Sequence, residues 1–220
     1  MIAACDGACK GNPGPAAWAW VLLEADGSGG SWEAGPLGKA TNNVAELTAL
    51  ERLLAPADPD AQLEVRMDSQ YAMNAVTTWL PGWKKRGWKT AAGTPVANRE
   101  LIVSIDALLT DRVTFVHVAA HQVDGDPLNA LADEAASTAA ITQQAAAGSL
   151  TAERAQAMIN RDAGAKPAGA GRAAPGAAKA ASGTISAKFP GTCRCGQRYE
   201  AGTQIAKNPK GWGHPQCAQA

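Results

Sequence analysis

The sequence predicts an α/β protein with a mixed five-stranded sheet flanked by helices, followed by a small zinc-binding module. Three strand patterns separated by turn residues open the chain. A helical segment with one apolar stripe follows them, and strands and helices alternate after it. Cysteine and histidine residues near the end have the spacing of a zinc site. Sheets of this kind usually carry their functional residues at the carboxyl ends of strands.

The first three strands are expected over residues 1–8, 16–24 and 30–37. The connecting sequences GNPGP and ADGSGG consist largely of residues that favour turns. Because connections this short join antiparallel strands, we expect an antiparallel meander.

The next element is a helix over residues 42–54, NNVAELTALERLL, with an asparagine as the candidate N-cap. Leu50, Leu53 and Leu54 follow Glu46 by four, seven and eight positions, which places Glu46 on the buried stripe of this helix. A buried acid is costly unless a cation compensates its charge.

A fourth strand is expected over residues 63–67, where apolar and charged residues alternate. It ends at Asp68, and the sequence SQYAMNAV then begins a helix, so Asp68 lies at the carboxyl end of a strand. Further along we expect a helix over 98–109, a strand over 112–119 and a helix from 128 onward.

The composition divides the chain into three parts. Residues 1–140 carry the periodic patterns of a catalytic domain. Residues 141–183 are rich in Ala, Gly, Gln and Pro, and we expect a short helix near 150–159 followed by a disordered linker. Residues 184–220 are expected to form the zinc-binding module.

The composition also bounds the class of protein. A chain of 220 residues that is 46% hydrophobic can bury one core and a small satellite module. No apolar stretch approaches the roughly 18 residues that would indicate a transmembrane helix, and no signal-peptide pattern is visible. Five cysteines, an odd number, fit a reducing compartment better than a disulfide framework. We therefore expect a cytoplasmic protein without a membrane partner.

The net charge of zero hides an uneven distribution. Residues 1–165 contain 12 Lys and Arg against 19 Asp and Glu, whereas residues 166–220 contain 8 against 1. This asymmetry favours a tail that binds a polyanion, attached to an acidic body. The alternative is that the cations only keep a flexible tail soluble.

Four acids lie in four separate contexts: Asp6 in CDGACKGNPGP, Glu46 in TNNVAEL, Asp68 in MDSQY and Asp133 in NALADEA. Taken singly, Asp6 could open a turn, Asp68 could cap a helix, and the other two could be solvated helix acids. Taken together they suggest a site for divalent metals. Oxygen donors without histidine or cysteine favour magnesium or manganese, the ions of phosphoryl transfer and phosphodiester hydrolysis.

With these motifs the chain resembles a known family, the type 1 ribonucleases H. The resemblance rests on CDGACKGNPGP, TNN followed by EL, DSQY, WKKRGWKT and a final His, Asn and Asp segment, and it covers roughly residues 1–140. It implies the ribonuclease H-like sheet and an endoribonuclease that hydrolyses the RNA strand of RNA/DNA hybrids with two Mg or Mn ions.

The resemblance also implies a role for each acid. Asp6 would bridge both ions, Asp133 would complete the ion that activates water, and Glu46 with Asp68 would hold the ion beside the leaving group. His121 would assist proton transfer or product departure, or else it is an ordinary loop histidine. The segment from His121 to Asp133 is longer than is usual in the family. Asp124 and Asp126 are therefore alternative ligands, although the sequence DGDP favours a turn role for them.

Contacts to the hybrid follow from the same resemblance. Residues near the metals that could distinguish a 2′-hydroxyl or contact phosphates are Cys9, Gly11, Asn12, Thr41, Asn42, Asn43, Gln70 and Asn129. The segment WLPGWKKRGWKT would be a basic protrusion that grips the hybrid through Trp83, Lys84, Lys85, Arg86, Trp88 and Lys89. The alternative for the first group is that these residues only form turns. The alternative for the second group is that its tryptophans belong to the core and its cations are solvated on the surface.

The tail offers Cys193, Cys195, His214 and Cys217, and three thiolates with one imidazole suit a tetrahedral zinc ion. Its surroundings resemble a small treble-clef-like module, although C-x-C stands where C-x-x-C is commoner. Free thiols on a disordered tail are the alternative. The partner of the tail is nucleic acid or a protein.

Two other functions are compatible with the fold. One is a catalytically silent protein that binds hybrids, and the complete set of acids argues against it. The other is a nuclease of the same fold that acts on DNA junctions or ends. The motifs GNPGP, TNN, DSQY and WKKRGWKT favour hybrids instead.

Overall fold

The structure is a computed structural model that describes residues 1–119, 125–164, 184–186, 191–193, 195–200, 202–208 and 211–217. Its contacts divide the chain into two compact units, Met1–Pro167 and Ala168–Ala220.

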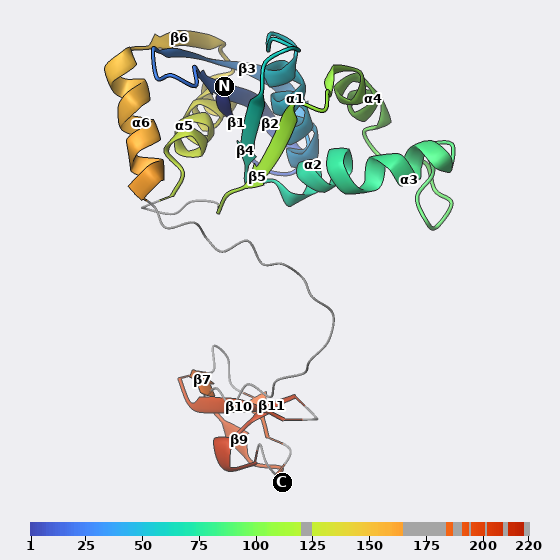
Figure 1. The fold of residues 1–220 in the computed structure, drawn as a ribbon. Coiled ribbons are helices and arrows are strands. Elements are labelled where there is room, and N and C mark those ends of the chain that lie inside the picture. The colour runs from blue at the N-terminus through green and yellow to red at the C-terminus, as the bar shows by residue number, and fades with distance from the viewer. Residues whose placement is uncertain are drawn as a thin grey trace. The chain divides into compact units, whose positions relative to one another are not determined.

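A six-stranded mixed sheet forms the centre of the first unit, in the spatial order β5-β4-β1-β2-β3-β6 (Figure 1). Its strands are β1 (Ile2–Cys9), β2 (Gly14–Leu23), β3 (Gly30–Ala40), β4 (Leu63–Met67), β5 (Val113–His117) and β6 (Ala146–Leu150). The first three form the expected antiparallel meander, β4 pairs in parallel with both β1 and β5, and β6 pairs antiparallel with β3.

The helices of this unit are α1 (Asn42–Leu54), α2 (Gln70–Asn74), a π-helical turn (Ala75–Trp79), α3 (Leu80–Lys85), α4 (Arg99–Leu108), α5 (Pro127–Thr142) and α6 (Ala152–Gly164). Alternate residues of β1 show that α1 and α5 cover opposite faces of the sheet. Ala3 and Cys5 pack with the leucines of α1, whereas Ala4 packs with Leu128 and Ala132 of α5. The central strand is therefore buried on both sides.

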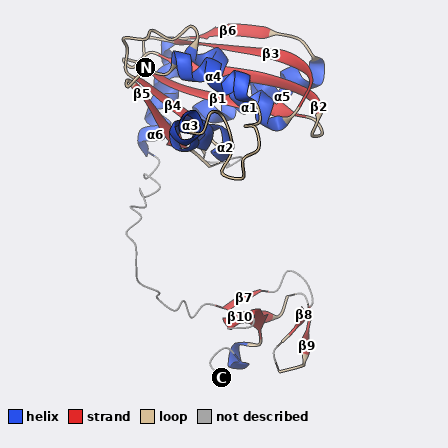
Figure 2. Cartoon of the chain, turned by 90° about the vertical axis from the view of Figure 1, so that its right-hand side faces the viewer, coloured by secondary structure: helices blue, strands red, loops and turns tan. Residues whose placement is uncertain are grey.

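The predicted count of five strands is wrong, because residues beyond 141 add a sixth. Gly30–Ala34 of β3 pairs with Ala146–Leu150, so that β6 runs along β3 at one edge of the sheet (Figure 2). Helix α6 follows at once, and its Ala155 and Met158 are buried with Leu150. In place of a linker from residue 141, the chain thus continues the core of the first unit. The sequence AAGSL has little β-propensity, and pairing with β3 overrides it.

The structure identifies the N-caps of two predicted helices. Thr41, not an asparagine, is the N-cap of α1, since its hydroxyl accepts from the N–H of Val44 at 3.3 Å. Ser69, not Asp68, caps α2 through the N–H of Ala72. The carboxylate of Asp68 is therefore not used as a helix cap. The strand expected over 112–119 is shorter and ends at His117.

The second unit contains two small sheets. Its elements are β7 (Thr184–Ser186), β8 (Gly191–Thr192), β9 (Arg198–Tyr199), β10 (Gln204–Asn208), β11 (Gly211–Gly213) and a 3-10 turn (Pro215–Cys217). Strand β10 lies between β7 and β11, and β8 pairs with β9. Across both units, no helix within the described residues is long and apolar enough to span a membrane.

Candidate active site

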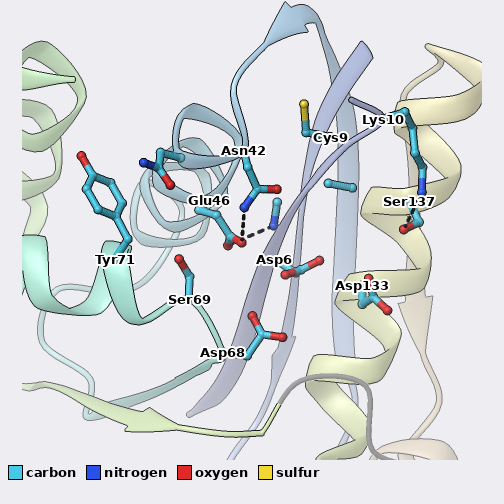
Figure 3. A pocket seen from close by; sticks show the side chains of 13 residues that line it. Asp6, Cys9, Lys10, Asn42, Glu46, Asp68, Ser69, Tyr71, Asp133 and Ser137 are labelled. Carbon is cyan, nitrogen blue, oxygen red and sulfur yellow. Dashed lines mark hydrogen bonds between the residues drawn. The ribbon is translucent and has the colours of Figure 1, made fainter. Parts of the chain in front are cut away.

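The four acids named from the sequence line one pocket of the first unit. Asp6 lies within β1, Glu46 in α1, Asp68 directly after β4 and Asp133 in α5. Figure 3 shows Asp6 between Asp133 on one side and Glu46 and Asp68 on the other. One carboxylate oxygen from each of Asp6, Glu46 and Asp68 lies within 4.8 Å of the others, which is close enough for shared cations. The cavity has a volume of about 480 Å³.

Glycine at position 7 lets α1 approach the central strand. A Cβ atom at Gly7 would lie 2.2 Å from the backbone nitrogen of Glu46, so any larger residue would push the helix away. The N–H of Gly7 donates to Oε2 of Glu46 at 3.3 Å, and Nδ2 of Asn42 donates to Oε1 at 3.4 Å. The carboxylate of Glu46 is therefore held in place from two sides.

Burial and mutual repulsion disfavour the charged forms of these acids. Asp6 is 6% exposed and Glu46 5%. Desolvation, followed by the charges of Asp68 and Asp133, raises the pKa of Asp6 to about 8. Desolvation, followed by the charges of Asp6 and Asp68, raises the pKa of Glu46 to about 9. Cations between the carboxylates would relieve this repulsion.

Asn129 links α5 to Asp68 at the end of β4. This side chain is buried on α5, and its Nδ2 donates to Oδ2 of Asp68 at 3.4 Å. Asp133 lies one helical turn further along α5, as the predicted spacing requires, and its carboxyl group interacts with that of Asp6. His117, at the end of β5, lies 3.2 Å from the backbone oxygen of Asp68 through its Nε2.

Several predicted contact residues surround this pocket. Oδ1 of Asn12 accepts from the N–H of Asn42 at 3.2 Å, which ties the exposed GNPGP hairpin to the start of α1. The thiol of Cys9 donates to the carbonyls of Gly11 and Ala40. The remaining predicted contacts are Thr41 at the helix cap, exposed Asn43 at the pocket rim and exposed Gln70 at the start of α2.

Sequence reasoning missed four polar residues of the pocket lining. Lys10, Ser69, Tyr71 and Ser137 complete its rim. Nζ of Lys10 lies 3.4 Å from Oγ of Ser137, so the cation spans from the hairpin to α5 at the mouth of an acidic pocket (Figure 3). Its place within the motif CDGACKGNPGP was the available signal. Ser137 could have been found from its position four residues after Asp133.

The protrusion divides into core and surface residues. The indole of Trp83 is buried in the main core, which corrects its prediction as a contact to nucleic acid. Trp88 is half-buried against the same core, with the guanidinium of Arg99 over its ring. Nζ of Lys84 pairs with Asp106 at 2.8 Å.

The exposed cations of the protrusion are Lys85, Arg86 and Lys89, besides Lys84. Nε of Arg86 donates to the carbonyl of Lys89 at 3.2 Å, which keeps these two residues on the same turn.

The predicted proton-transfer residue His121 and the alternative metal ligands Asp124 and Asp126 lie in the same segment of the sequence. His121 and Asp124 lie outside the described residues. Asp126 is the N-cap of α5 and pairs with Arg66 at 2.7 Å, so both its oxygens have partners. The turn role expected of Asp126 is thus a helix-capping role.

The second unit brings together its own ligand set. One atom from each of Cys193, Cys195, His214 and Cys217 lies within 4.8 Å of the others. The N–H of His214 donates to the sulfur of Cys193 at 3.3 Å, and backbone hydrogen bonds of this kind lower the pKa of that thiol to about 6. Desolvation raises the pKa of Cys217 to about 11. A tight turn, with the N–H of Gly196 donating to the carbonyl of Cys193, accommodates C-x-C.

A central strand with one buried acid, completed by acids from two helices and a neighbouring strand, defines the class of metal-dependent phosphodiesterases. The RNase H family model matches residues 1–141, so the chain belongs to the RNase H family. Its activity is that of a ribonuclease H, an endonuclease that hydrolyses the RNA strand of RNA/DNA hybrids. This family uses divalent metal ions.

The curated relatives differ in how much of the chain they cover. Ribonuclease HI of Streptomyces coelicolor is 61% identical over 98% of this chain and 95% of its own length. Ribonuclease H of Tropheryma whipplei is 43% identical over 64% of this chain and 84% of its own. The similarity to the Streptomyces protein therefore extends over both units.

Two solved structures share the fold. LC9-RNase H1, a type 1 RNase H with the type 2 active-site motif, superposes with a TM-score of 0.58 at 21% identity over 74% of this chain and 83% of that chain. The foamy viral protease-reverse transcriptase in complex with RNA/DNA hybrid gives 0.53 at 19% identity over 64% of this chain and 20% of that chain.

Proposed function

We propose that Asp6, Glu46, Asp68 and Asp133 hold two divalent ions and that the hybrid is cleaved at this pocket. The observation that carries the proposal is the cluster of three carboxylates within 4.8 Å, two of them almost fully buried and with raised pKa values. Buried acids so close together need cations if they are to be charged at neutral pH. The pocket supplies them with oxygen ligands.

The ions are proposed to be magnesium or manganese. The ligating atoms are carboxylate oxygens, which suit hard ions, and the cluster contains no sulfur or imidazole. When bound, such a pair activates a water for attack and stabilises charge on the leaving oxygen. Asp6 would be shared by both ions, because its carboxyl group interacts with acids on both sides of it.

His121 keeps the role proposed from the family, proton transfer or product departure, since an imidazole titrates near neutrality. The hybrid is read at the rim of the pocket. Amide side chains of Asn12, Asn42 and Asn43, the exposed Gln70 and the buried Asn129 supply donors and acceptors for 2′-hydroxyls and phosphates. Lys85, Arg86 and Lys89 contact phosphates further away.

One zinc ion is proposed for Cys193, Cys195, His214 and Cys217. The ligand set contains the sulfur and nitrogen donors that zinc prefers, and a unit whose described residues bury few apolar side chains gains stability from such an ion. Elemental analysis of the full chain should give one zinc, and Cys195→Ser/Cys217→Ser should remove it. Cys5→Ala, which changes a buried thiol of the first unit, should keep the zinc. A full-length chain without zinc would contradict this assignment.

We also propose the cytoplasm as the location. The five cysteines are free thiols, and four of them lie at sites where a thiol contacts loop carbonyls or the proposed zinc. Such thiols persist in a reducing compartment.

The experiment is a cleavage assay on matched RNA/DNA hybrid, RNA duplex and DNA duplex, with Mg²⁺ or Mn²⁺ added to metal-free protein. We expect cleavage of the hybrid alone, on its RNA strand. Asp133→Asn should reduce cleavage to background, whereas Glu134→Gln, the neighbouring exposed acid on α5, should behave as wild type. Wild-type cleavage by Asp133→Asn would show that the last ligand lies elsewhere.

A further inference from the structure

Arg66 is a buried cation on β4, two residues before Asp68, and it is 6% exposed. A guanidinium at such a position needs anionic partners to offset its lost hydration. Its Nη1 donates to Oδ2 of Asp126 at 2.7 Å, and its Nε donates to Oε1 of Glu64 at 2.8 Å. The pair with Asp126 connects residues 60 positions apart and joins β4 to α5.

Asp126 uses its second oxygen to begin α5. Oδ1 accepts from the N–H of Leu128 at 3.0 Å and from the N–H of Asn129 at 2.8 Å. A single side chain, 5% exposed, therefore ties the first turn of the helix to Arg66 on the strand. The position of the start of α5 relative to β4 depends on this pair, which we call the Arg66–Asp126 brace.

Along β4 and along α5, the polar residues that link the two elements follow one another in the same order. Arg66 and Asp68 are two residues apart, on one face of the strand path. Asp126, Asn129 and Asp133 are separated by three and four residues, on one face of the helix. The brace is the first link between them, and the hydrogen bond from Asn129 to Asp68 at 3.4 Å is the second. Beyond these links Asp68 and Asp133 stand in the catalytic pocket (Figure 3).

We propose that Arg66 and Asp126 are positioning residues for the metal site, because their ion pair sets where Asp133 on α5 stands relative to Asp68 on β4. The inference rests on the proposed roles of Asp68 and Asp133 as metal ligands. Neither Arg66 nor Asp126 lines the catalytic pocket. Residues that orient metal ligands typically change metal affinity or activity by about 10- to 100-fold when they are replaced.

A pair with a merely structural role would act differently. Its loss would lower the stability of the unit without changing the metal affinity of the molecules that remain folded. The variants must therefore preserve folding. Arg66→Met keeps much of the side-chain volume, and Asp126→Asn keeps an oxygen for the helix cap. Replacing both together removes the two opposite charges of the brace at once, and Glu64, the other acid paired with Arg66 in the described residues, is partly exposed.

The experiment compares the full-length Arg66→Met/Asp126→Asn double variant with wild type and with Leu150→Ala. Leu150 is the last residue of β6 and is buried with Leu128 of α5, so its truncation loosens the packing against the same helix but removes no polar contact of β4, of Asp126 or of the acids. Mn²⁺ binding is measured by calorimetry in the absence of nucleic acid, at a temperature where thermal melts show all three proteins folded. Values of kcat and KM are then measured on one hybrid.

The double variant should bind Mn²⁺ about 10- to 100-fold more weakly than wild type and should have a lower kcat. Its KM for the hybrid should stay within about twofold, because the nucleic-acid contacts are intact. Leu150→Ala should bind Mn²⁺ as wild type does. Arg66→Lys, which keeps the charge, should recover part of the affinity. Should the double variant not fold, Asp126→Asn alone takes its place with the same expectation.

Equal Mn²⁺ affinity in the double variant and in Leu150→Ala would overturn the positioning role. Asp68→Asn and Asp133→Asn distinguish this result from a failure of the proposed function. If those two variants bind Mn²⁺ and cleave as wild type does, the ligand assignment itself is wrong. If they lose both properties while the double variant keeps both, the ligands are right and only the brace is wrong.

Discussion

At the scale of single residues, the site contains carboxyl groups at positions that the fold shields from water. Asp6 in the central strand and Glu46 on the inner side of α1 both have raised pKa values, and desolvation is the largest cause in each. The arrangement that makes them good ligands for cations therefore destabilises the metal-free protein. Function and stability oppose each other at these positions.

Asp6→Asn tests both sides of this opposition. The variant should lose hybrid cleavage, because the proposed bridging charge is gone, while keeping most of its hybrid binding. In metal-free wild type, the carboxyl group has a folded pKa of about 8, above its unfolded value near 4. Its contribution to stability is therefore present below about pH 4 and is lost as the pH rises toward 8. The amide cannot ionise and avoids this loss.

The Tm of metal-free Asp6→Asn should accordingly rise relative to wild type between pH 5 and pH 8, by about 2–4 °C for each kcal/mol recovered. Thermal melts with a chelator at several pH values measure this difference. Added Mg²⁺ should reduce it, because only wild type gains the bridging contacts. A Tm difference that is the same at both pH values would mean that Asp6 is not strained in the metal-free fold.

At the scale of secondary-structure elements, β6 and α6 extend the sheet beyond the residues that the family model matches. The match ends at 141, whereas Leu150, Ala155 and Met158 are buried with Leu128 of α5. Since α5 carries Asn129 and Asp133, these elements support the catalytic helix from the side away from the pocket. Strand β6 and helix α6 therefore pack as part of the catalytic unit.

Truncation separates this role from that of the tail. A chain ending at Thr142 should be destabilised, because an edge of β3 and the apolar side of α5 become exposed. A chain ending at Pro167 should keep the stability of the first unit. Leu150→Ala alone should cost about 2–5 kcal/mol. Urea unfolding followed by circular dichroism measures all three, and equal midpoints for the two truncated chains would refute the contribution of β6 and α6.

The protrusion built by α3 and the loop after it carries its cations on the surface, whereas its indoles are buried (Trp83) or half-buried (Trp88). Lys85→Ala/Lys89→Ala should raise KM for the hybrid and leave kcat unchanged, because these side chains do not line the pocket of the acids. Each lost phosphate contact should lower the slope of log affinity against log salt by about 0.9. Arg161→Ala, an exposed cation on α6, serves as the control. If the slope of log affinity against log salt is unchanged in the double variant, the hybrid does not contact Lys85 and Lys89.

At the scale of the whole molecule, an acidic catalytic unit is joined to a basic second unit. Residues 166–220 hold 8 Lys and Arg against a single acid. A tethered cationic unit raises its own concentration near any polyanion that the catalytic unit holds. We expect the second unit to add affinity for nucleic acid and to leave the chemistry unchanged.

Deleting residues 168–220 should therefore leave kcat as in the full chain, weaken hybrid binding and make its salt dependence shallower. Affinities of the full-length and shortened proteins on one hybrid, measured at several salt concentrations, decide the matter. The variant Cys195→Ser/Cys217→Ser of the full chain removes two proposed zinc ligands but keeps the cations of the second unit. Its affinity for the hybrid therefore shows whether binding needs the fold of this unit or only its charge. Parallel salt plots with equal affinities would show that the second unit binds a protein or acts only in solubility.

Much of the site could be predicted because its residues lie in local motifs. The period of α1 alone places Glu46 on the buried side, and Asp68 follows a short alternating strand. The meander, α1, β4 and α4 were found in the same way, from patterns within a few residues. The burial of Trp83 in the core could not be predicted from residue spacing. The same helical spacing is expected whether a tryptophan packs into the core or contacts a ligand.

By itself the sequence determined the elements of the meander, the motifs that carry the four acids and the two candidate ligand sets, since each depends on short-range order along the chain. Only the tertiary structure decided the Arg66–Asp126 brace, the burial of Trp83 and the pairing of β6 with β3. These join residues 60 or more positions apart, or depend on what packs against a side chain. Local propensity carries no information on such partners, because their energy comes from desolvation and contact that exist only once the chain has folded.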